Sequence, residues 1–172
     1  MQPASTPFDP ASVLSPKSSW QVTEIEAFLA EARLPLRVST LSADGFPHIT
    51  SLWFRYRGGH FYCGTQRNAQ VSLHLGQNPR TGFEVAVNDP PYRGISGVGM
   101  ARVLDADARE VMETVVDRYL GTRDRKLKDW LMSRLATEVI IEITPHRLTS
   151  WDFSHRMTAP RPAPAEPGGV PR

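Results

Sequence analysis

Two tight turns separate three short runs of β-forming residues in the first half of the chain. The first turn, Asp44-Gly45, lies between the runs Leu36–Leu41 and His48–Tyr56. The second turn, Gly58-Gly59, leads into the run His60–Gly64. Such pairs supply the positive φ angles that two-residue hairpins require. Strands joined by them are antiparallel, because parallel neighbours need a crossover of a dozen residues or more. The sequence therefore predicts an antiparallel meander of three strands.

Helices and further strands are predicted along the rest of the chain. Apolar residues recur at helical spacing over 24–33, where Thr23 and Glu26 form a capping box, and over 69–76. A longer apolar stripe follows Asp105 and Asp107, either of which can cap a helix, and ends at Gly121. A further stripe begins at Leu127 and ends at Leu135. Additional β-rich runs cover residues 81–88, 95–104, 138–144 and 147–152.

These elements predict an α+β fold. Six or seven antiparallel strands with helices at the ends favour a closed or nearly closed barrel, because closure removes exposed strand edges. The 172 residues, 40% of them hydrophobic, suffice for one core and one domain. Residues 1–18 and 158–172 carry few large apolar groups, so we expect loose tails on either side of a domain spanning 19–157.

Charge and hydropathy exclude several classes of partner. A net charge of +2, from 20 basic and 18 acidic residues, gives no reason to expect nucleic acid. We see no run of 18 apolar residues and no apolar core of a signal peptide, so we expect no membrane span and a cytoplasmic protein. The single cysteine, Cys63, excludes an internal disulfide.

Most common catalytic and metal motifs are missing from the sequence. His60 and Cys63 are three residues apart in a strand and face opposite sides, so we expect no metal site there. There is no GxSxG elbow and no phosphate-binding P-loop, and Cys63 inside a β run indicates a small buried hydrophobe. Gly94, Gly97 and Gly99 lie in a strand, where they favour a bulge or a close backbone approach over a ligand.

One polar segment suggests an anion site. Between Tyr62 and Gln70 a strand runs out through polar residues into the start of a helix, where free N–H groups and polar side chains can hold a phosphate. The alternative is a solvated turn with Arg67 in water. Trp53 and Trp151 each lie in a short β run beside polar groups, and either can flank a planar ligand or belong to the core.

The order of several segments resembles the pyridoxamine 5′-phosphate oxidase-like, FMN-binding split-barrel family. The segments are TLSADGFPHITSLWF at 40–54, HFYCGT at 60–65 and HLGQNPR at 74–80. DPPYRG at 89–94, DRYLG at 117–121 and SWDF at 150–153 are similar to one bacterial branch of that family. The resemblance covers residues 24–157.

The resemblance implies a split-barrel homodimer with two flavin sites at the subunit interface and a small-molecule substrate. The expected contacts fall into three groups. The isoalloxazine ring would lie along Thr50, Ser51, Leu52 and Trp53. The phosphate would be held by Tyr62, Cys63, Thr65, Arg67, Asn68 and Gln70. The partner subunit would contribute Tyr92, Arg93 and Trp151.

The chain also departs from the family pattern. The Arg-Lys pair of the phosphate-binding turn is replaced by Gln70-Val71 or Arg67-Asn68, which leaves one positive charge fewer to bind the phosphate. No Arg-x-His element follows Trp151, and His155-Arg156 is the nearest approach, so pyridoxamine phosphate is not expected as the substrate.

The leading hypothesis is an FMN-binding oxidoreductase whose substrate the sequence does not identify. The flavin would carry out the chemistry, so no acid or base residue is predicted. The alternatives are a deazaflavin-dependent reductase on the same fold and a non-catalytic module that binds or senses flavin or haem.

Overall fold

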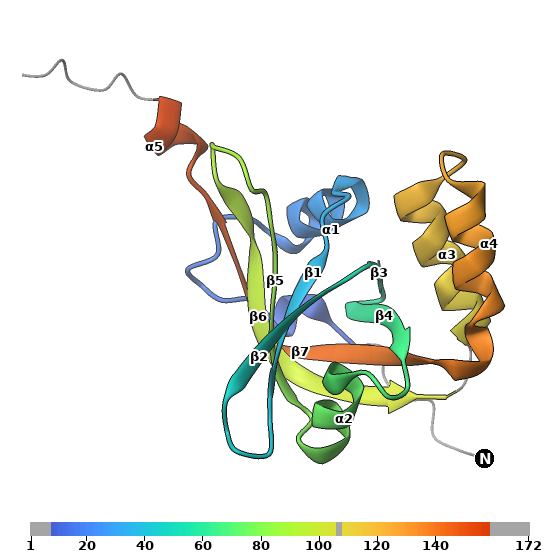
Figure 1. The fold of residues 1–172 in the computed structure, drawn as a ribbon. Coiled ribbons are helices and arrows are strands. Elements are labelled where there is room, and N and C mark those ends of the chain that lie inside the picture. The colour runs from blue at the N-terminus through green and yellow to red at the C-terminus, as the bar shows by residue number, and fades with distance from the viewer. Residues whose placement is uncertain (1–7, 106–107, 159–172) are drawn as a thin grey trace, which may run out of the picture.

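The computed structural model describes residues 8–105 and 108–158 (Figure 1). The strands are β1 (Leu36–Leu41), β2 (Pro47–Leu52), β3 (Phe54–Arg57), β4 (His60–Gln66), β5 (Arg80–Ala86), β6 (Arg93–Leu104) and β7 (Glu138–Asp152). The helices are η1 (Pro10–Val13), α1 (Val22–Glu31), α2 (Gln70–Gln77), α3 (Ala108–Leu120), α4 (Arg125–Ser133), η2 (Leu135–Thr137) and α5 (Ser154–Thr158).

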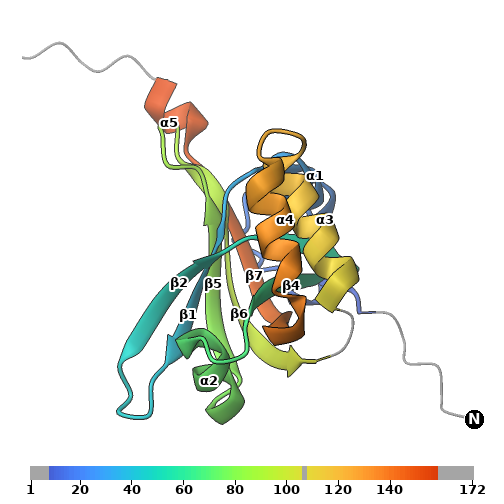
Figure 2. The ribbon, with the colours of Figure 1, turned by 45° about the vertical axis from the view of Figure 1, so that its right-hand side comes forward.

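The strands form one curled antiparallel sheet. Its seven strands have the order β2-β1-β5-β6-β7-β4-β3, so β2 and β3 are the two edges. Only Trp53 separates the end of β2 from the start of β3. Since one residue connects the two edges, the sheet must curl until the edges approach each other, with α3 and α4 packed side by side near this point (Figures 1 and 2). The expected α+β split barrel is confirmed.

Aromatic rings fill the interior of the barrel. Phe61 lies at the centre of this cluster, with ring centroids 4.9 Å from both Tyr56 and Phe83 and 5.7 Å from Phe54. Burial raises the pKa of the Tyr56 hydroxyl to about 12. Cys63 is fully buried in the same core, and burial raises the pKa of its thiol. The expectation that Cys63 is a small buried hydrophobe is confirmed.

Two predictions about the strands are wrong. The run His48–Tyr56, expected as one strand, is divided at Trp53, so that β2 pairs with β1 and β3 pairs with β4 at opposite edges. Barrel closure requires this break. The runs 138–144 and 147–152 are instead one strand, β7, which pairs with β6 from Ile140 to Asp152. A shift in register beside Pro145 lets the strand continue through the proline.

The N-terminal part of the chain differs from expectation in two respects. Helix α1 begins at Val22, and the Glu24 carboxylate accepts from the Gln21 backbone N–H at 2.8 Å, so the cap involves Gln21 and Glu24 rather than Thr23 and Glu26. Contacts with the sheet begin before the expected domain boundary at residue 19. The Ser15 N–H donates to the Leu148 carbonyl at 2.7 Å, which places part of the expected tail against β7.

The C-terminal end of α3 agrees with the sequence. Gly121 follows the helix with φ +55°, and its N–H donates to the Asp117 carbonyl at 2.9 Å, as expected for a terminating glycine. Of the two candidate caps at its start, Asp107 lies outside the described residues, and Asp105 forms an ion pair with Arg67. Across residues 8–105 and 108–158, every helix is too short or too polar to cross a bilayer.

The β6 glycines mark close backbone contacts, as predicted. A Cβ at Gly97 would lie 2.5 Å from the Arg147 carbonyl oxygen, and one at Gly99 would lie 2.3 Å from the Thr144 carbonyl oxygen. The register shift of the β6–β7 pair lies between Val98 and Gly99. Both expected reasons for these glycines, a bulge and a close backbone approach, are confirmed.

Replacing Gly99 by alanine is expected to lower the free energy of unfolding by about 1–3 kcal/mol, since backbone cannot move aside as a flexible side chain can. Urea unfolding followed by circular dichroism measures the change. Gly76→Ala is the matched control, because a Cβ at Gly76 in α2 meets nothing within 4 Å. Equal midpoints for the Gly99→Ala variant and the wild type would contradict the close approach.

Candidate functional site

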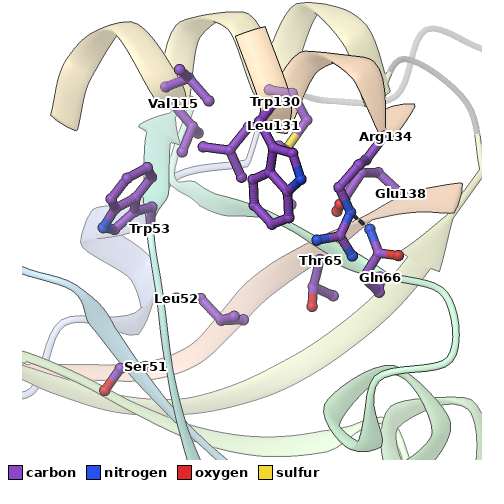
Figure 3. A pocket seen from close by; sticks show the side chains of 13 residues that line it. Ser51, Leu52, Trp53, Thr65, Gln66, Val115, Trp130, Leu131, Arg134 and Glu138 are labelled. Carbon is purple, nitrogen blue, oxygen red and sulfur yellow. Dashed lines mark hydrogen bonds between the residues drawn. The ribbon is translucent and has the colours of Figure 1, made fainter. Parts of the chain in front are cut away.

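A pocket of about 310 Å³ opens beside Trp53, where the chain passes from one sheet edge to the other (Figure 3). Strands β2 and β4 form its floor, and α3 and α4 cover it. Its lining consists of Ser51, Leu52, Trp53, Gly64, Thr65, Gln66, Met112, Val115, Val116, Trp130, Leu131, Arg134 and Glu138.

One end of the pocket is apolar and aromatic. Trp53 stacks on Tyr119 of α3, with ring centroids 5.0 Å apart and an interplanar angle of 3°. This stacking holds the indole as part of the wall, facing Val115 and Leu131 across the pocket (Figure 3). A rigid aromatic wall suits a planar ligand, because flat rings prefer to stack on one another.

The other end of the pocket is polar. Gln66 donates to the Glu138 carboxylate, as the dashed line in Figure 3 marks, and accepts from the Thr137 hydroxyl at 3.0 Å. The Arg134 guanidinium lies over the Trp130 ring, 4.5 Å from its centroid, and extends toward Thr65 and Gln66 (Figure 3). Within the described part of the chain, no carboxylate forms an ion pair with Arg134. The pocket thus offers an unpaired cation beside a hydroxyl.

Four residues predicted to contact a cofactor line this pocket. Ser51 and Leu52 end β2, Trp53 directly follows them, and Thr65 comes from β4. Thr50 does not line the pocket, although it adjoins Ser51. The structure therefore brings together the predicted ring-binding strand and one residue of the predicted phosphate-binding segment.

The other predicted phosphate ligands are dispersed. Tyr62 lines a separate hollow, and Cys63 lies in the core. Strand alternation explains this separation, because neighbouring side chains point to opposite faces. Arg67 pairs with Asp105, and its backbone N–H donates to the Thr137 carbonyl at 2.9 Å. Asn68 and Gln70 are exposed at the start of α2.

The residues expected to come from a partner subunit lie at the end of the sheet that carries α5 (Figures 1 and 2). The Tyr92 carbonyl accepts from the Phe153 N–H at 3.0 Å, Arg93 opens β6, and Trp151 pairs with Gly94. None of these three residues contributes to the pocket of its own chain. Their contribution from a second subunit stays a prediction.

Sequence reasoning missed the polar end of the pocket. Gln66, Trp130, Arg134 and Glu138 were not nominated, although they lie within it. The available signal was the spacing of Trp130 and Arg134, four residues apart at the end of a predicted helix, where Arg134 is the C-cap residue of α4. Trp130 is also an exposed side chain, which is uncommon for so large an aromatic residue.

Metal chemistry has no support among the residues that the structure describes, because no group of three His, Cys, Asp or Glu side chains is placed to hold an ion. His60 and Cys63 lie on opposite faces of β4, and the His60 Nδ1 is 3.0 Å from the Thr144 hydroxyl. This imidazole therefore contacts β7 rather than Cys63.

No protein-family model and no curated protein sequence matches the chain. Solved structures do resemble it. The conserved hypothetical protein Rv2991 from Mycobacterium tuberculosis is 24% identical with a TM-score of 0.71, over 91% of this chain and 97% of that one. An F420 reductase is 23% identical with a TM-score of 0.60, over 70% and 93%. A pyridoxamine 5′-phosphate oxidase-related, FMN binding protein from Nostoc punctiforme is 10% identical with a TM-score of 0.56, over 79% and 85%.

At these identities the likeness concerns the fold. It agrees with the strand order and with the barrel closure at Trp53. This chain is therefore a split-barrel protein, with the fold shared by pyridoxamine 5′-phosphate oxidase-related, FMN-binding proteins.

Proposed function

We propose that this protein is an oxidoreductase that binds a flavin-type cofactor, with FMN as the leading candidate, in the pocket beside Trp53. One observation carries the proposal. Ser51, Leu52, Trp53 and Thr65, which the family resemblance predicts as cofactor contacts, come from two different strands and line one pocket. The pocket also joins an aromatic wall to an unpaired cation, the two features needed for a flat ring and a phosphate.

Each end of the pocket would have its own part in binding. Leu52 and Trp53 would orient the ring, while Val115 and Leu131 of the covering helices would exclude water from it. Thr65 and Arg134 would hold the phosphate by hydrogen bonds, the second of them charge-assisted. When bound, the flavin supplies hydride or electron transfer, and the protein contributes position and electrostatics.

A deazaflavin-dependent reductase is the second candidate. The similarity to an F420 reductase favours it. So does the weak cationic character of the pocket, because Arg67 pairs with Asp105 and Glu138 places a carboxylate on the same wall as Arg134. A site with so little net positive charge suits a coenzyme that dissociates after each turnover.

An absorbance spectrum of the purified protein, followed by parallel titrations with FMN and with the deazaflavin coenzyme, tests the proposal. We expect a flavin band or saturable uptake of FMN at one molecule per chain. Preferential uptake of the deazaflavin would select the second candidate. Failure of both to bind would contradict the proposed function.

We also propose that a second copy of the chain covers one face of the sheet. Ile49, Ser39, Gly82 and Val98 form a row across β2, β1, β5 and β6, because each is the register partner of the next. Ile49 is 74% exposed and Val98 is 43% exposed, and apolar exposure of this kind on neighbouring strands is typical of an interface. Ser51, two residues along β2 from Ile49, shares this face and lines the pocket.

The double substitution Ile49→Lys/Val98→Lys is expected to convert a dimer into a monomer, because it places charges at the centre of the interface. Light scattering should give twice the chain mass of 19.2 kDa for the wild type and a single chain mass for the variant. Leu73→Lys is a control, since Leu73 is an exposed apolar residue on α2. A monomeric wild type at micromolar concentration would contradict the dimer.

A further inference from the structure

A second hollow, of about 630 Å³, lies between the β3–β4 hairpin, the end of β6 and the start of α3. It shares no lining residue with the pocket beside Trp53. Its lining consists of Arg55, Arg57, Gly58, His60, Tyr62, Val103, Leu104, Asp105, Glu110, Val111 and Ile140.

Two guanidinium groups define the polar side of this hollow. Arg55 and Arg57 are two apart on β3, so they point to the same side, and both donate to the Glu110 carboxylate, at 3.0 and 3.5 Å. The side chain of Arg55 is only 16% exposed, and its Nε has no hydrogen-bond partner among the described residues. A buried, charged donor without an acceptor is costly, so this nitrogen is free to donate to an acceptor that enters the hollow.

Two ring side chains stand next to these cations. The Arg55 guanidinium lies over the Tyr62 ring, 5.5 Å from its centroid, and the His60 ring is 6.2 Å from the same centroid. Burial, with the Glu142 carboxylate as the second cause, raises the pKa of the Tyr62 hydroxyl. This hydroxyl therefore remains a hydrogen-bond donor at neutral pH, as an anion site requires.

Apolar side chains also line the hollow. Val103, Leu104, Val111 and Ile140 line it, and Val103 at the end of β6 is an exposed apolar residue. A ligand whose body is flat and apolar would cover the exposed Val103 and the half-buried Leu104 and gain hydrophobic free energy there, whereas Val111 and Ile140 are already buried.

The carboxylates of the hollow are already engaged. Asp105 pairs with Arg67, outside the hollow. Glu110 holds both arginines, and the Arg55 guanidinium lowers the pKa of its carboxyl, so it is ionised at neutral pH. Because the Glu110 side chain is 64% exposed, it can turn into water when a stronger acceptor arrives. Glu110 thus occupies the place that an anionic group would take.

We propose that this hollow is a second ligand site, for a phosphate monoester with a flat apolar body. The phosphate replaces Glu110 between Arg55 and Arg57 and accepts from Tyr62, while the body lies against Val103 and Leu104. A phosphate has negative charge and three acceptor oxygens, so it binds donors on separate, charged side chains more strongly than a neutral group does. The site is independent of any cofactor bound beside Trp53.

Selective ¹⁵N-glycine labelling offers a direct test, because Gly58 lines this hollow and Gly64 lines the other pocket. The probe is phenyl phosphate, with inorganic phosphate and benzyl alcohol as partial probes. We expect phenyl phosphate to shift the Gly58 amide saturably, to bind more tightly than either partial probe, and to leave Gly64 unchanged. A shift confined to Gly64, or equal binding of benzyl alcohol, would overturn the proposal.

Two substitutions have opposite expected effects. Arg57→Gln, at a largely exposed side chain, should weaken phenyl phosphate about 10-fold or more, the loss expected for a hydrogen bond to a charged group. Glu110→Gln should tighten it several-fold by removing the competing acceptor. Arg109→Gln, one residue away on α3, is the matched control and should not change the affinity. Weaker binding by Glu110→Gln would overturn the proposal, since a merely structural carboxylate gives that result.

Discussion

Replacing Arg118 by alanine is expected to lower the free energy of unfolding by about 3 kcal/mol, the loss of two or more hydrogen bonds from a charged group. Arg118 of α3 reaches the C-terminal end of α1, where Nη1 donates to the Ala30 carbonyl at 2.9 Å and Nη2 donates to the carbonyls of Leu29 and Ala32. The guanidinium also lies over the Phe54 ring, 5.4 Å from its centroid. A cation at a helix C-terminus is further favoured by the helix dipole.

Urea unfolding measures this effect, with Arg109→Ala as the control on the same helix. Among the residues that the structure describes, Arg109 pairs only with Glu113, at an exposed position, so its removal is expected to change stability little. Because α3 supplies Val115 to the pocket, Arg118→Ala should also weaken flavin binding. Equal stabilities for the two variants would show that α3 does not depend on its contact with α1.

Replacing Arg134 by glutamine is expected to weaken FMN binding about 10- to 100-fold, because the phosphate loses its charge-assisted hydrogen bond. The fold should be unaffected, because the interaction of the Arg134 guanidinium within the described residues is with the exposed Trp130 ring. Fluorescence titration with FMN measures the affinity, and circular dichroism checks the fold.

Arg67→Gln is the informative comparison for Arg134→Gln. The family resemblance predicts Arg67 as a phosphate ligand, whereas the structure pairs it with Asp105 and places Arg134 in the pocket. We expect the larger loss of affinity for Arg134→Gln. A larger loss of FMN affinity for Arg67→Gln would indicate that the phosphate binds at the start of α2 instead.

The parts of the fold that local chemistry determines were predictable. Gly45, Gly58 and Gly59 have positive φ angles of 85°, 57° and 83°, and the two hairpins that they close were recognised from the sequence. The break at Trp53 was not predictable in this way, because residues 48–56 form an uninterrupted β-rich run. It arises from closure of the whole barrel, which no short window of sequence contains.

The same distinction applies to the candidate site. The segment Ser51–Trp53 and Thr65 were found because a family pattern marks them in the sequence. Arg134, at the end of α4, reaches the same pocket through the packing of α3 and α4, and Glu138 reaches it because β7 pairs with β4, where Glu138 is the register partner of Gln66. No local signal indicates where those helices pack or which strands pair. The separation of Tyr62 from Cys63 was foreseeable, because adjacent strand residues face opposite sides.

Tryptophan emission gives the most direct test that the pocket beside Trp53 holds a flavin. The variant Trp20→Phe/Trp151→Phe keeps only Trp53 and Trp130 of the four tryptophans, and both line the pocket. Titration with whichever of FMN and the deazaflavin binds more tightly is predicted to quench this emission saturably, with the same midpoint as cofactor uptake. A cofactor that binds without quenching Trp53 and Trp130 would contradict the account, because it would occupy another part of the protein.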